Sequence, residues 1–69
     1  MKISARYMVS CKVKEIQEGS VNAEVILELS DGQEMTSIIT LSSAKNLGLR
    51  PGMAVRAIVK ASNVMIGVE

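Results

Sequence analysis

The chain has 69 residues, 48% of them hydrophobic, and eight Lys and Arg against seven Asp and Glu leave a net charge of +1. A chain of this length buries only about 60% of its unfolded surface, so it usually needs a disulfide, a metal or oligomerisation. Cys11 is the only cysteine and histidine is absent, which excludes an internal disulfide and disfavours a zinc site. We therefore expect a single domain over residues 1–69 that is stabilised by forming an oligomer.

The first half of the chain has the alternation of β-strands. A first strand is predicted from about residue 3 to residue 16, because Val9, Cys11 and Val13 alternate with polar side chains. The residues EGS at 18–20 then turn the chain.

A β-hairpin follows. In residues 21–29 every odd position is apolar, which predicts a half-buried strand. Asp31-Gly32 indicates a two-residue hairpin turn, since Gly tolerates a positive φ. The residues EMTSIIT at 34–40 form the second arm.

The remaining elements complete a small barrel. Residues 42–48 predict a helix of one or two turns, with a Ser or Thr N-cap and Gly48 ending it in the left-handed conformation. Pro51-Gly52 predicts a turn, residues 53–61 a fourth strand and residues 64–68 a short fifth strand. The order predicts a mainly β protein: an OB-like Greek-key barrel of about five strands with one short helix.

The helix start carries more hydroxyls than a cap needs. Thr40, Ser42 and Ser43 stand together in ITLSSAKNLGL. The N-terminus of a helix presents unpaired N–H groups and a partial positive charge, which favour an anion. An ordinary N-cap with solvated serines explains the same residues, so both interpretations stay open here.

Two further segments repeat this chemistry. In SAR, Ser4 and Arg6 are two residues apart and point to one side of a strand, where a hydroxyl and a guanidinium suit a tetrahedral oxyanion. In KAS, Lys60 and Ser62 have the same spacing. For each pair taken alone, an ordinary solvated strand face is the favoured interpretation.

The three segments share donors and lack carboxylates. A carboxylate would repel a bound dianion, and the acidic residues from Glu15 to Glu34 fall in other segments. Without histidine, and without a visible nucleophile–base pair, we do not expect an enzyme.

Three segments in order, ISAR, TSIITLSSAKNLGL and VKASNVMIG, resemble the molybdenum–pterin-binding proteins, or molbindins, which consist of a single Mop (TOBE-type) domain. The resemblance covers essentially the whole chain. It departs from the common pattern at Tyr7, where the family often has Asn, at Pro51, and at Asn63, where an acidic residue is frequent.

The resemblance implies both an assembly and a ligand. Such proteins are OB-like barrels that exchange N-terminal strands to form dimers, and three dimers form a hexamer. They bind molybdate, and also tungstate, at subunit interfaces and serve as intracellular molybdenum stores. It also implies that no side chain coordinates the metal directly and that the oxyanion is held by Ser4, Arg6, Thr40, Ser43, Ala44, Lys60, Ala61 and Ser62, with the alanines acting through their backbone amides.

Two other functions remain as alternatives. An OB barrel often binds nucleic acid, but Tyr7 is the only aromatic residue and the net charge is small. A purely structural oligomerisation domain would use the same polar residues at its interface. The N-terminus lacks the apolar stretch of a signal peptide and no apolar run is long enough to span a bilayer. With one free thiol, we expect a cytoplasmic protein without membrane or nucleic-acid partners.

Overall fold

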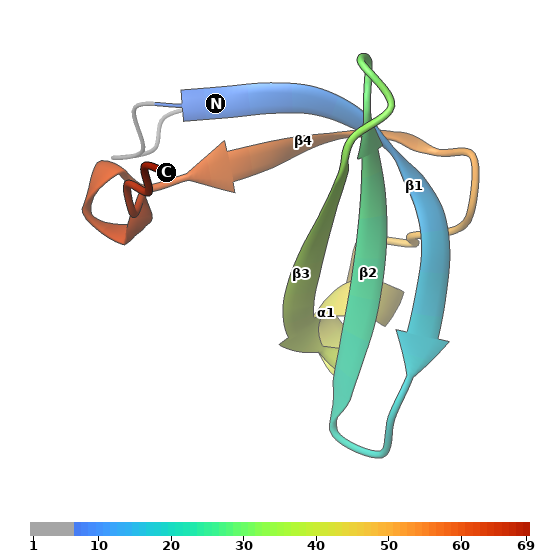
Figure 1. Cartoon of the computed structure of the whole chain (residues 1–69). Helices are drawn as coiled ribbons and strands as arrows, with labels where there is room; N and C mark the ends of the chain where they lie inside the picture. The colour runs from blue at the N-terminus through green and yellow to red at the C-terminus, as the bar shows by residue number, and fades with distance from the viewer. Residues whose placement is uncertain (1–6) are drawn as a thin grey trace.

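The computed structural model describes residues 7–69, which form a curled antiparallel sheet with one short α-helix (Figure 1). The elements are β1 (Tyr7–Glu18), β2 (Asn22–Leu29), β3 (Glu34–Thr40), α1 (Leu41–Asn46), β4 (Ala54–Val59) and the 3₁₀-helix η1 (Ala61–Asn63). The strand order is β3-β2-β1-β4. Three strands in succession with the fourth beside the first make a Greek key, so the predicted fold class is confirmed.

β1 is shared between two partners. Its first half, Tyr7–Lys12, pairs with β4, while Cys11–Glu18 pairs with β2. Figure 1 shows the result: β4 and the first half of β1 project sideways from the layer that β1, β2 and β3 form together. We call this two-stranded projection the arm, and its tip is the end formed by Tyr7 and Val59.

A β-bulge divides the two halves of β1. Val13 pairs with Leu27 and Glu15 with the next residue, Ile26, so Lys14 is the extra residue. One extra residue reverses which side chains face the core. This is why β1 packs odd positions inward as far as Val13 and then the even position Ile16.

The core lies between the curled strands. Four buried side chains form its centre: Cys11, Val13, Val25 and Leu27. β4 adds Val55 and Ala57 from one face, as its alternation predicts. The apolar residues around these four are only partly buried, so the core of a single chain is thin.

The β2–β3 hairpin is confirmed, but the prediction of a two-residue turn is wrong. The Gly32 N–H donates to Leu29 O at 3.0 Å and the Leu29 N–H donates to Gln33 O at 2.8 Å. Gly32 has φ +88°, and no other residue type has a positive φ within residues 7–69. A two-residue type I′ turn needs positive φ at both central residues, so Asp31 instead takes part in a wider loop that ends in a left-handed Gly.

The helix ends as predicted. Gly48 follows α1 with φ +65°, and its N–H donates to Lys45 O at 3.1 Å. The Leu49 N–H donates to Ala44 O at 3.2 Å, so the carbonyls of Ala44 and Lys45 near the end of the helix are satisfied. The left-handed Gly turns the chain toward β4 without the strain that a side chain would bring there.

The end of the chain differs from its prediction. β4 stops at Val59 rather than continuing to residue 61, and residues 64–68 form no strand in the part of the chain that the structure describes. The Asn63 N–H donates to Lys60 O at 2.9 Å, which makes η1 and turns the chain at the tip of the arm. Beyond this turn, the apolar residues 64–68 pair with none of the four strands. Among residues 7–69 no helix is long and apolar enough to cross a membrane.

Candidate oxyanion site

Thr40 and Ser43 form a hydroxyl pair at the start of α1. Thr40 is the last residue of β3 and the N-cap of the helix, in an extended conformation with φ −68° and ψ 150°. Its Oγ1 accepts a hydrogen bond from the Ser43 N–H at 3.0 Å and donates one to Ser43 Oγ at 2.8 Å. The predicted cap is confirmed, and it is Thr40.

These hydrogen bonds determine which donors at the helix start remain available to a ligand. The Thr40 proton is committed to Ser43 Oγ, so the Ser43 hydroxyl is left with its own proton to donate outward. A hydroxyl that already accepts a hydrogen bond is polarised and becomes a better donor. Two amides of the first turn are occupied as well, since the Leu41 N–H donates to Val21 O at 2.8 Å and the Ser43 N–H is capped.

Ala44 is placed by packing. Its side chain is buried, and it is the one buried residue of α1. The methyl group therefore faces the core, and any contact with a ligand involves its backbone alone. No acidic residue lies in the first turn of the helix.

Lys60, Ala61 and Ser62 lie together at the tip of the arm, and all three are exposed. Lys60 precedes η1 in an extended conformation, φ −81° and ψ 133°. The expectation that Lys60 and Ser62 share a strand face is wrong, because β4 has ended before them. They are neighbours at a turn instead.

Within one chain, the residues at the start of α1 lie far from those at the tip of the arm. Figure 1 shows α1 behind the lower part of β2 and β3, whereas η1 lies at the far tip of the arm. Ser4 and Arg6 fall outside the described residues. The structure thus brings together Thr40, Ser43 and Ala44, and separately the three residues of the arm tip.

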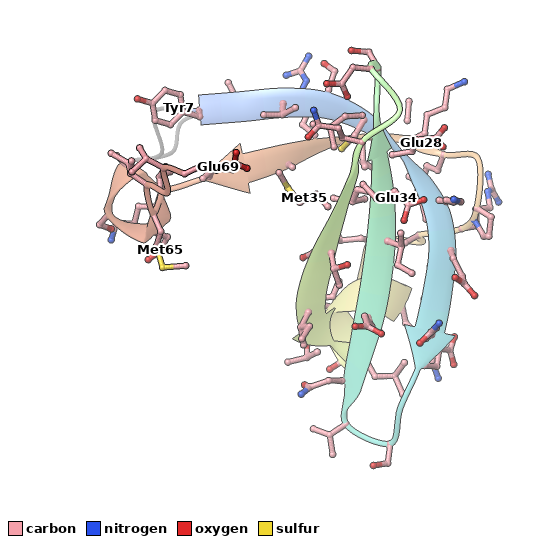
Figure 2. The ribbon with its side chains drawn as sticks, viewed as in Figure 1. Tyr7, Glu28, Glu34, Met35, Met65 and Glu69 are labelled. Carbon is pink, nitrogen blue, oxygen red and sulfur yellow. The ribbon has the colours of Figure 1, made fainter. Side chains whose placement is uncertain are left out.

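Charge at the arm tip is less simple than the sequence indicates. In the view of Figure 2, Glu69 appears over the end of β4. Glu69 is a carboxylate beyond the acidic residues from Glu15 to Glu34. Glu28 and Glu34, by contrast, lie near the β2–β3 hairpin at the other end of the sheet (Figure 2).

Lys14 lies outside the candidate site and forms an ion pair with Glu34. Lys14 Nζ, on the bulge, donates to Glu34 Oε2 at the start of β3. This hydrogen bond and the charge of Glu34 raise the pKa of Lys14 above its ordinary value of 10.5, with smaller contributions from Glu28 and Glu15. Lys14 therefore ties β1 to β3 across β2.

Two hollows lie on the surface formed by residues 7–69. The larger, of about 700 Å³, lies between β3 and β4, and we call it the β3–β4 groove. Its lining is mainly apolar, with Leu27, Met35, Ile39, Leu49, Val55 and Val59 among its residues. The smaller, of about 330 Å³, has Lys45, Arg50 and Glu18 in its wall. The apolar lining makes the larger hollow unsuitable for a dianion, whereas the smaller one has mixed charge, because Glu18 faces the same hollow as Lys45 and Arg50.

Comparison with known proteins identifies the family. Residues 3–66 match the family model of the TOBE domain. A probable molybdenum-pterin-binding protein of Haemophilus influenzae is 45% identical over 69 residues, covering 100% of both chains.

Solved structures agree. A molybdate-binding protein from Sporomusa ovata gives a TM-score of 0.93 at 38% identity, covering 99% of this chain and 100% of that one. The cytoplasmic molybdate-binding protein ModG, with molybdate bound, gives a TM-score of 0.94 at 46% identity, covering 100% of this chain and 49% of ModG. The chain therefore belongs to the TOBE-domain family, among its molybdenum-pterin-binding proteins.

Proposed function

We propose that this protein binds molybdate, and also tungstate, as a single Mop domain over residues 1–69 and serves as a cytoplasmic molybdenum store. The observation that carries the proposal is the full-length likeness to proteins described as binding molybdate. The hydroxyl pair of Thr40 and Ser43 adds local support, because Ser43 Oγ accepts a hydrogen bond from Thr40 and is thereby a better donor to a ligand.

The binding site is shared between subunits. The donors at α1 and those at the arm tip lie at different ends of one chain (Figure 1), so a pocket that uses both takes them from two copies. In this arrangement Ser43 and the backbone of Ala44 come from one chain, and Lys60, Ala61 and Ser62 come from another. Ser4 and Arg6 would join from the beginning of the chain, where a guanidinium supplies a fork of donors to an oxyanion.

The protein acts as a hexamer, a trimer of dimers, and not as an enzyme. A thin apolar core and several exposed large apolar side chains support an oligomer. The proposed ligands are hydroxyls, amides and two cations, which bind an oxyanion and have no group positioned to transform it.

Calorimetry with molybdate, tungstate, sulfate and phosphate tests the proposal. We expect comparable binding of the first two, which have the same charge and nearly the same shape, and weak binding of the smaller sulfate and phosphate. Absence of molybdate binding by the intact oligomer would leave a structural oligomerisation domain as the function. A titration with single-stranded DNA, in which we expect no binding, tests the nucleic-acid alternative.

A further inference from the structure

The loop of the β2–β3 hairpin contains the dipeptide Asp31-Gly32, and both residues are exposed. The carboxyl group of an Asp can condense with the nitrogen of the next residue, and a Gly at that position has no side chain to hinder the attack. A Cβ built on Gly32 would meet no atom within 4 Å, so the space around this peptide bond is open. Protection of the bond therefore depends on hydrogen bonds and not on steric cover.

The condensation joins atoms of the two neighbouring residues. The Gly32 nitrogen attacks Cγ of the protonated Asp31 carboxyl group, a C–N bond forms, and the carboxyl hydroxyl leaves as water with the proton of the Gly32 N–H. The product is a cyclic imide. Water then adds to one of the imide carbonyls. Addition at Cγ restores Asp31, whereas addition at the backbone carbonyl breaks its bond to nitrogen and leaves Gly32 attached through the Asp31 side chain, as isoaspartate.

In the folded loop the Asp31 carboxylate is held by Gln33. Its Oδ1 accepts a hydrogen bond from the Gln33 N–H at 3.1 Å, and its Oδ2 accepts one from Gln33 Nε2 at 3.0 Å. The first bond is the Asx turn that Asp commonly forms with the backbone two residues on. Both carboxylate oxygens therefore point toward Gln33, which fixes the orientation of Cγ.

The attacking nitrogen is engaged as well. The Gly32 N–H donates to Leu29 O at 3.0 Å, and the Leu29 N–H donates to Gln33 O at 2.8 Å. The reaction needs the nitrogen and Cγ to be aligned for attack, and it removes the proton that Gly32 shares with Leu29. Both reacting groups must therefore leave hydrogen bonds that the folded loop provides.

We propose that Asp31-Gly32 is a latent site of isoaspartate formation, which the folded hairpin keeps unreactive through the hydrogen bonds from Gln33 to the Asp31 carboxylate. The loop precedes β3, whereas Thr40 ends that strand. The reaction therefore involves none of the groups proposed to hold molybdate, and it is tested without an anion.

Formation of isoaspartate would loosen the hairpin. The backbone would pass through the Asp31 side chain and become one atom longer between Leu29 and Gln33. The length of a hairpin loop fixes the register of its strands, and here Glu28 pairs with Glu34 just beyond the loop. The isoaspartyl form should therefore melt at a lower temperature than the unmodified protein.

Incubation in water labelled with heavy oxygen measures the reaction. Hydrolysis of the imide adds one labelled oxygen whichever carbonyl the water attacks, so peptide mass spectrometry after digestion in ordinary water detects isoaspartate and restored Asp31 together. The full chain is incubated at neutral pH, folded or unfolded in guanidinium chloride. We expect slow uptake at Asp31 in the folded chain and faster uptake in the unfolded chain, where the loop's hydrogen bonds are absent.

Two substitutions at Gln33 test the role of its side chain. Gln33→Ala removes the Nε2 donor and keeps the backbone N–H. We expect uptake in the folded chain to rise about two- to tenfold, because a single hydrogen bond has a modest net free energy. Gln33→Glu keeps the length of the side chain but replaces the donor by a carboxylate, and it should accelerate uptake at least as much. In guanidinium chloride both variants should react at the wild-type rate.

Gln17→Ala is the matched control. It removes an exposed glutamine from β1, where Gln17 pairs with Glu24 and not with the loop. Its uptake at Asp31 should equal that of the wild type in the folded chain.

Three results would overturn the proposal. Equal uptake in the folded and unfolded wild type would mean that the loop gives no protection. Protection that survives both Gln33 substitutions would assign it to the hydrogen bond between Gly32 and Leu29 alone. Absence of uptake even in the unfolded chain would remove Asp31-Gly32 as a reactive site.

Discussion

Thr40 stands where a strand becomes a helix, and its hydroxyl is engaged in both directions. It accepts from the Ser43 N–H and donates to Ser43 Oγ. The cap and the donor pair therefore depend on the same atom. Stability and anion binding should respond together when that atom is removed.

Thr40→Ala should lower the free energy of unfolding by about 1 kcal/mol, the usual cost of losing an N-cap side chain. It should also weaken molybdate binding, because Ser43 loses the donor that polarises and orients it. Urea denaturation and calorimetry measure the two effects. Thr40→Ser retains the oxygen and Ser42→Ala leaves the cap intact, so both should stay near wild type; unchanged binding in Thr40→Ala would remove the hydroxyl pair from the site.

Lys60→Ala should weaken molybdate binding by about 1.5–3 kcal/mol, the usual worth of a hydrogen bond to a charged group. Arg6→Ala should act similarly, and Arg6→Lys should recover only part of the loss, because the planar fork is missing. Calorimetry gives the affinities. Arg56→Ala removes an exposed cation of the same arm and is the control. If it weakens binding as much as Lys60→Ala, general charge and not a specific contact attracts the anion.

The elements differ in how far the sequence predicts them. β2, β3 and α1 agree with their predicted ranges to within a residue or two, since alternation, the Thr40 cap and Gly48 are local signals. The bulge at Lys14 is not visible in the alternation of β1, because it depends on the register with β2.

The predicted fifth strand failed for a related reason. Residues 64–68 have the pattern of a strand, but a strand needs a partner, and η1 turns the segment away from its own sheet.

The residues of the candidate site are also divided between two parts of the chain, the start of α1 and the tip of the arm. Thr40 and Ser43 are three residues apart in the sequence and are joined by hydrogen bonds at the helix start. Their separation from Lys60 follows from the direction of the arm, which no local pattern encodes.

Lys14 and Glu34 form an ion pair across the sheet. The pKa of Lys14 is raised by its hydrogen bond to Glu34 and by the charge of that carboxylate. Because folding raises the pKa of Lys14, the protonated side chain stabilises the folded state. This stabilisation is fully present at pH values below the ordinary pKa of 10.5 and is lost as the pH rises through the raised pKa.

Glu34→Gln should therefore lower the melting temperature slightly at neutral pH and low salt, since both side chains are partly exposed. The difference from wild type should shrink in high salt and disappear as the pH rises through the raised pKa of Lys14, above its ordinary value of 10.5. Thermal melts at several pH values measure it. Glu18→Gln, which removes a carboxylate outside this pair, is the control, and a difference that persists at alkaline pH would contradict the assignment.

The whole molecule carries more apolar surface than a lone domain hides. Large apolar side chains are exposed on both outer strands and beyond them, including Ile38, Ile58 and Met65. With a core of few buried residues, the chain gains more from association than from internal packing.

We expect six chains in native mass spectrometry and in sedimentation at micromolar concentration. Dilution should lower the melting temperature, because association stabilises only the folded chain. A folded monomer at micromolar concentration, stable without dependence on concentration, would contradict the expectation.

The tip of the arm has an optical consequence. Tyr7 is the only aromatic residue in the chain; it lies directly across from Val59, one residue before Lys60, and its side chain is 53% exposed. All near-ultraviolet fluorescence of the protein therefore comes from this single phenol ring at the arm tip. Docking of a neighbouring subunit there changes the polarity around the ring, so its emission is a built-in, label-free signal of subunit exchange, with a time course that can be followed after mixing.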